Sequence, residues 1–121
     1  MQVDHVIIPV SNLDASRRFY EQALAPFGAH VAMEFPGTLI LAGAEPGSMI
    51  ALRQMESVTP VHVALSADRD RVHAFYDAAT AAGGRDNGAP GLRPHYHDNY
   101  YAAFVHDPDG NNVEAVCHAP A

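Results

Sequence analysis

The chain has 121 residues, of which 48% are hydrophobic and 17% are charged, a balance typical of one soluble globular domain rather than a membrane span. Its formal net charge of -7, with only 7 Lys and Arg, argues against nucleic acid or an anionic membrane as the partner and favours a small molecule. Because Cys117 is the single cysteine, no internal disulfide can form, and we expect a cytoplasmic protein with a buried, packing thiol.

The first half of the chain predicts a βαβββ unit. A run rich in β-branched residues predicts a strand over residues 3–10. Apolar residues at helical spacing then predict a helix from Leu13 to Leu24, with Ser11 as its N-cap and Asp14 three residues later. Three short strands follow, over residues 29–35, 38–42 and 48–54.

The second half repeats this order. A strand is predicted over residues 60–66, and an apolar stripe from Val72 to Ala82 predicts a helix that Gly83-Gly84 ends. The remaining strands are expected over residues 92–96, 100–106 and 111–118. Neither module, about 1–56 or about 57–121, is large enough for a core of its own, so the sequence predicts a single α+β domain over residues 1–121.

Two histidines occupy equivalent positions in this repeat. His5 and His62 lie 57 residues apart, each in an aliphatic strand. Because side chains alternate along a strand, each histidine points away from the face that its apolar neighbours give to the helix. A lone strand histidine is more often an ordinary core or surface residue than a ligand, but the repeat would allow this pair to converge on one metal ion.

Glu114 offers the third ligand that a metal site needs. It lies among small and apolar residues of the last strand, where an ionised carboxylate is costly unless it is paired or coordinated. The alternative is an edge-strand glutamate that faces water. Two imidazoles and a carboxylate suit one divalent metal, Zn, Ni, Mn, Co or Fe, and ligand type alone does not choose among them.

These residues carry a family resemblance. His5, His62 and the segment 107–114, which reads Asp-Pro-Asp-Gly-Asn-Asn-Val-Glu, resemble the vicinal oxygen chelate superfamily of glyoxalase I, extradiol dioxygenases, fosfomycin resistance proteins and bleomycin-binding proteins. The resemblance implies two βαβββ modules forming a cupped mixed sheet, with His5, His62 and Glu114 as metal ligands. It also implies a homodimer and leaves open whether the site forms within one chain or between two.

The resemblance implies a divalent-metal-dependent lyase or isomerase of the glyoxalase type, acting on a small substrate with adjacent oxygens through a stabilised enolate or oxyanion. Glyoxalase I has a second glutamate as its base, and the position equivalent to Glu114 in the first module is Ala51 or Ile50. The expected carboxylate is therefore missing. The alternatives are an Fe(II) extradiol-type dioxygenase and a non-catalytic protein that binds a drug or metabolite.

The segment 93–101 is the densest polar and aromatic cluster in the sequence. In the functional interpretation its side chains reach the metal pocket, where one group moves protons and another binds substrate. The predicted catalytic residues are His97, Tyr100 and Tyr101, and the predicted substrate-binding residues are Arg93 and His95. The alternative is an ordinary strand pair with one exposed face. His118 shares strand parity with Glu114 but is expected to be frayed and exposed near the end of the chain.

Overall fold

The computed structural model describes residues 1–121, and residues 5–54 form an N-terminal sheet. Its strands, in order across the sheet, are β1 (His5–Val10), β4 (Met49–Gln54), β3 (Thr38–Ala42) and β2 (His30–Phe35). β1 runs parallel to β4, whereas β3 is antiparallel to both of its neighbours. Helix α1 (Leu13–Ala23) and the 3₁₀ turn η1 (Ala25–Phe27) connect β1 to β2.

Residues 62–117 form a C-terminal sheet with the same connectivity. Its strands, in order, are β5 (His62–Ser66), β9 (Asn112–Cys117), β8 (Tyr101–His106) and β6 (Arg85–Asp86), with β7 (Gly91–Leu92) also paired to β8. β5 is parallel to β9, as β1 is to β4, and helix α2 (Arg69–Ala81) follows β5. The prediction of an α+β fold built from two βαβββ modules is confirmed.

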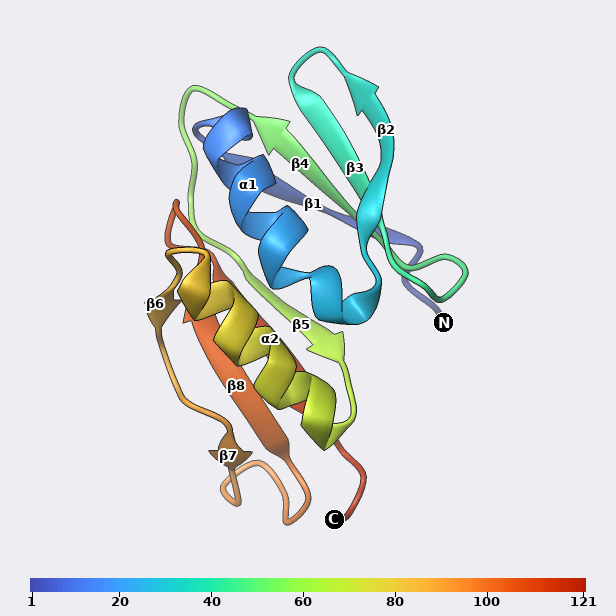
Figure 1. The fold of residues 1–121 in the computed structure, drawn as a ribbon, viewed down its shortest axis with the longest axis vertical. Helices are drawn as coiled ribbons and strands as arrows, with labels where there is room; N and C mark the ends of the chain where they lie inside the picture. Colours follow the sequence, from blue (N-terminus) through green and yellow to red (C-terminus); the bar gives the residue numbers. More distant parts are fainter.

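The two modules share one core. Helices α1 and α2 pack against each other and lie on the near side of the two sheets in Figure 1. The buried face of α1 carries Ser16, Phe19, Tyr20 and Ala23, which follow one another at the helical period. Phe19, Tyr20 and Ala23 join Phe75 of α2 and the inward residues of both sheets in one cluster, which also contains Cys117 as predicted. The outer faces of the sheets are therefore left free of helix.

A buried polar network ties the second module to the first. The Tyr20 hydroxyl donates to Asp107 Oδ2 over 2.6 Å, and the Asn111 side chain donates to the same oxygen over 2.8 Å. Asn111 also donates to the Pro9 carbonyl and accepts from the Val61 backbone N–H. Burial, followed by the charge of Asp107, holds the pKa of Tyr20 well above its usual value. The turn between β8 and β9 thus contributes the main polar contact between the modules.

Two local predictions are wrong. The N-cap of α1 is Asn12, whose side chain accepts from Ala15 N, whereas the backbone N–H of Ser11 donates to Asp109 Oδ2. The predicted strand over 92–96 is instead the end of β7 followed by a turn. Pro94 has no N–H to give a ladder, and the Tyr96 N–H closes a turn on the Arg93 carbonyl.

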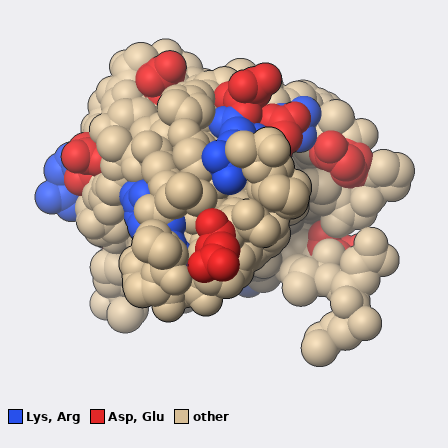
Figure 2. Space-filling view, turned by 90° about the horizontal axis from the view of Figure 1, so that it is seen from below, with Lys and Arg blue, Asp and Glu red and all other residues tan.

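Surface charges are mixed in sign. On the face shown in Figure 2, basic side chains lie among acidic ones on a largely uncharged surface. Arg17, for example, contacts Glu21 and Glu34, each over 2.6 Å. No helix in this chain has both the length and the apolar character needed to cross a membrane.

Candidate functional site

Glu114 is the centre of a polar cluster on the outer face of the C-terminal sheet. It lies on β9, opposite Ala64 of β5 and Phe104 of β8, and is only 1% exposed. A carboxylate buried to this degree needs hydrogen-bond partners for its oxygens. Its Oε1 is 2.7 Å from Nε2 of His62, and its Oε2 accepts a hydrogen bond from the Tyr100 hydroxyl. Both oxygens are therefore held by side chains of this chain.

His62 reaches Glu114 diagonally across the parallel pair of β5 and β9. Its strand partner is Asn112, two residues before Glu114, so the two side chains share one face of the sheet. The side chain of His62 is 52% exposed, whereas that of Glu114 is 2% exposed. Because a carboxylate only accepts, this contact requires a proton on Nε2 of His62. One side of the pair is thus open to solvent or to a ligand.

Tyr100 lies just before β8 and bonds to the other oxygen of Glu114. Desolvation raises the pKa of Tyr100 to about 12, helped by the hydrogen bond to Glu114 and by the charge of Glu114, and Arg93 opposes the shift. The phenol is therefore protonated at neutral pH and acts as a hydrogen-bond donor.

Aromatic side chains surround the Tyr100 ring. The ring centroids of Tyr96, His118 and His97 lie 4.7, 5.2 and 5.5 Å away. The Asn99 backbone N–H donates to Nδ1 of His97, so in the neutral histidine Nε2 carries the proton. This Nε2 lies 2.9 Å from Nδ1 of His118 and donates to it. His118 is thus part of the cluster, whereas the sequence predicted a frayed residue. Its strand parity with Glu114 was the one feature of the sequence that indicated this position.

The other predicted site residues lie elsewhere or make other contacts. Tyr101 points to the helix side of the sheet, where its hydroxyl lies 2.6 Å from Nε2 of His73, so it does not join the cluster. The Arg93 guanidinium donates to the Gly91 and Ala89 carbonyls and braces its own loop. His95 is exposed and rests against Tyr96, with ring centroids 4.2 Å apart.

His5 does not meet His62 and Glu114 within one chain. It lies on the outer face of the N-terminal sheet, with Nδ1 2.8 Å from a carboxylate oxygen of Asp4 and 51% of its side chain exposed. No group of three or more His, Cys, Asp or Glu side chains with the geometry of a metal site forms in the chain. A single copy therefore contributes two of the three predicted ligands to one place.

The strand registers identify the counterpart of Glu114 in the first module. Ile7 pairs with Ala51 between β1 and β4, as Ala64 pairs with Glu114 between β5 and β9. Ala51 is therefore the equivalent residue, and the outer face of the N-terminal sheet has no carboxylate there. Glu45, the nearest acidic residue before β4, lies in a loop and contacts Arg71.

Comparisons with known proteins agree on the fold. A family model described as Glyoxalase/Bleomycin resistance protein/Dioxygenase superfamily matches residues 2–115. No curated protein matched significantly. A glyoxalase/bleomycin resistance protein from Albidiferax ferrireducens T118 is 23% identical with a TM-score of 0.80, covering 96% of this chain and 97% of its own. A glyoxalase-related enzyme from Fulvimarina pelagi is 22% identical, with a TM-score of 0.75. That match covers 97% of this chain and 88% of the enzyme. The fosfomycin resistance protein FosX from Mesorhizobium loti is 16% identical, with a TM-score of 0.71. That match covers 95% of this chain and 90% of FosX.

Proposed function

We propose, from the premise that this chain belongs to the glyoxalase/bleomycin resistance protein/dioxygenase superfamily, that it is a divalent-metal-dependent enzyme of the glyoxalase-like type. The reaction would be that of a lyase or isomerase, on a small substrate with adjacent oxygens. The observation that supports this most is the burial of Glu114 between His62 and Tyr100 on an otherwise open sheet face. Burying an ionised carboxylate is costly, so a glutamate kept here with two polar partners favours a role beyond packing.

The donors present suit a divalent metal. Nε2 of His62 and Oε1 of Glu114 converge to 2.7 Å from neighbouring strands, an imidazole and a carboxylate that Zn, Ni, Mn, Co and Fe all accept. The Tyr100 hydroxyl on Oε2 would orient the carboxylate, as hydrogen bonds to metal-ligating groups usually do. We propose His5 as the third ligand, supplied by a second copy of the chain.

Two observations support a site between copies. His5 belongs to a different sheet from Glu114, and one chain alone forms no three-donor group. The outer face of the N-terminal sheet also exposes large apolar side chains, with Ile7 40%, Met33 48% and Phe35 53% exposed. An open apolar face of this kind is typical of a protein contact surface. A homodimer that covers it would bring His5 toward the partner's Glu114.

The bound cation would act as a Lewis acid that stabilises negative charge on a substrate oxygen. In this chain Tyr100, protonated at neutral pH, and the pair of His97 and His118 next to it are the groups positioned to hold or move a proton. His95 lies exposed at the edge of the cluster and is available to a substrate, whereas Arg93 supports the loop. Because Ala51 replaces the second glutamate, we assign no glyoxalase I reaction.

Metal content tests this proposal. Protein purified without a tag or chelators should contain a stoichiometric divalent metal, and His5→Ala, His62→Ala and Glu114→Ala should each lose most of it. His30→Ala is the matched control, because His30 is an exposed strand histidine outside the cluster and should leave the metal content unchanged. Equal metal content in all variants would overturn the site. Oxygen uptake with catechols by the iron-loaded protein would assign the dioxygenase chemistry instead.

Mixing two inactive variants tests whether copies share the site. His5→Ala and Glu114→Ala chains, unfolded and refolded together, would form mixed dimers in which one of the two sites has all three ligands. With random pairing, about a quarter of the wild-type metal content should return. No recovery from the mixture would show that His5 acts within its own chain or not at all.

A further inference from the structure

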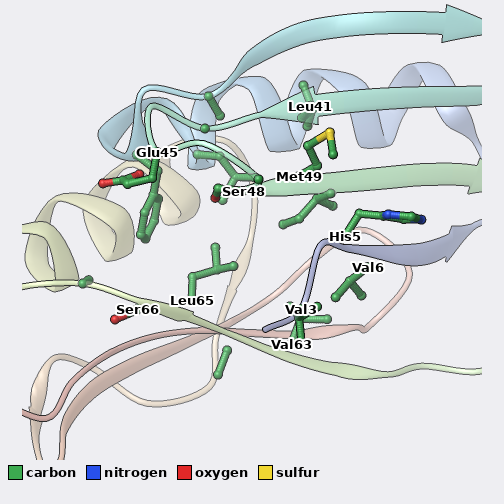
Figure 3. A pocket seen from close by; sticks show the side chains of 18 of the residues that line it. Val3, His5, Val6, Leu41, Glu45, Ser48, Met49, Val63, Leu65 and Ser66 are labelled. Carbon is green, nitrogen blue, oxygen red and sulfur yellow. The ribbon is translucent and has the colours of Figure 1, made fainter. Parts of the chain in front are cut away.

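A cavity between the two modules is separate from the cluster around Glu114. Its volume is about 500 Å³, within the range of small-molecule sites. It lies between the first residues of β1 and β4 on one side and β5 with the start of α2 on the other (Figure 3). His62, Tyr100 and Glu114 do not line it, whereas His5, which we propose as a ligand to the partner's site, does.

The inside of the cavity is apolar. Figure 3 shows Val6 and Leu41 from the first module facing Val63 and Leu65 from the second across the open space. Phe27 of η1 also lines it. Of its 21 lining residues, 12 are hydrophobic, so the part of a ligand that enters must itself be apolar.

The charges at the cavity are mostly negative. Its acidic residues are Asp4, Glu45 and Asp68, against a single arginine, Arg71. The Arg71 guanidinium is already engaged, because it lies 3.7 Å from Glu45 and 5.6 Å from the Phe27 ring centroid. Asp68 accepts from the Arg71 backbone N–H through one oxygen, which leaves its other oxygen free of protein partners.

His5 is the remaining titratable group that lines the cavity, and it contacts Asp4. A ligand carboxylate would therefore meet three carboxylates and an arginine that is already paired. A ligand ammonium group would meet acidic side chains whose charges the protein compensates only in part. The sign of the surrounding charge thus favours a cation.

We infer that this cavity binds small hydrophobic molecules that carry one positive charge, such as an aliphatic amine. The apolar chain lies between the modules, and the ammonium group lies near Asp68 and Glu45 at the mouth. The inference does not depend on a metal or on the reaction proposed above.

The test compares three probes with the same eight-carbon chain: n-octylamine, n-octanol and n-octanoate. Binding is measured by calorimetry and by amide chemical shifts at neutral pH. A partly exposed ion pair changes affinity by roughly two- to fivefold, and its effect has opposite sign for the amine and the acid. We therefore expect octylamine to bind about tenfold more tightly than octanoate, with octanol between them.

Four variants locate the site. Glu45→Gln and Asp68→Asn should each reduce the preference for the amine, and asparagine preserves the N-cap of α2. Asp77→Asn makes the same charge change on the exposed side of α2 and should have no effect. Leu65→Phe fills the cavity and should abolish binding of all three probes in a protein whose circular dichroism shows it folded. Failure of all probes to bind, tighter binding of octanoate, or undiminished binding by folded Leu65→Phe would each overturn the inference.

Discussion

Replacing Tyr20 with phenylalanine should destabilise the protein by removing one hydroxyl from the network between the modules. The ring stays buried in the shared core, where Tyr20 is 0% exposed, so little packing is lost. The lost bond is the 2.6 Å contact to Asp107 Oδ2, and Asp107 is itself 2% exposed. A hydrogen bond to a charged group contributes about 1.5–3 kcal/mol, and Asn111 still donates to the same oxygen. We therefore expect a loss of about 2 kcal/mol.

Urea denaturation followed by circular dichroism measures this loss. An unchanged m-value would show that the variant and the wild type expose the same amount of surface on unfolding. The expected decrease in Tm is roughly 5–12 °C. Tyr96→Phe is the matched control, because Tyr96 is 60% exposed and its loss of a hydroxyl should change the free energy of unfolding by less than about 0.5 kcal/mol.

The pH dependence of the same variant gives a second measurement. The pKa of Tyr20 is raised in the folded protein above the value of about 10 found in an unfolded chain. Its contribution to stability is therefore complete below pH 10 and is lost as the pH rises toward the folded pKa, by up to about 1.4 kcal/mol per pH unit. Tyr20→Phe lacks this loss, so its deficit relative to wild type should shrink above pH 10. A deficit below about 0.5 kcal/mol at pH 7, or one that stays constant up to pH 11.5, would refute this reasoning.

Two further predictions concern stability. Asn12→Ala should lower the free energy of unfolding by about 1 kcal/mol, because it removes the N-cap of α1. Ser11→Ala is the control and should have almost no effect. Equal losses in the two variants would contradict the assignment of Asn12 as the cap. Gly84→Ala should cost about 1–3 kcal/mol by thermal unfolding, because its Cβ would lie 2.5 Å from a Val105 methyl group and 2.7 Å from the Ala79 carbonyl oxygen. A fully stable Gly84→Ala protein would mean that this junction can relax.

The parts of the fold predicted from the sequence are those with a local pattern. The βαβββ repeat follows from β-branched runs and helical apolar spacing, and it limits the counterpart of Glu114 to Ala51 or Ile50, between which the strand register selects Ala51. The site was harder to predict because it depends on register. Tyr100 and Tyr101 are neighbours in the chain, yet the structure places one beside Glu114 and the other beside His73. Residues 83–94, which come before them, are rich in Gly and Pro. This segment has no hydrophobic periodicity that predicts to which face of the sheet each tyrosine points.

Because Ala51 occupies the position in the first module that Glu114 occupies in the second, the outer faces of the two sheets differ in what they must accommodate. The outer face of the first sheet carries no buried charge to satisfy, so its exposed Ile7, Met33 and Phe35 are free of the hydrogen-bonding requirement that Glu114 imposes on the second sheet. The second sheet has no such freedom, since each oxygen of its buried carboxylate depends on a particular partner. A duplicated chain of this kind can present an apolar surface from one copy while the other copy holds a buried carboxylate.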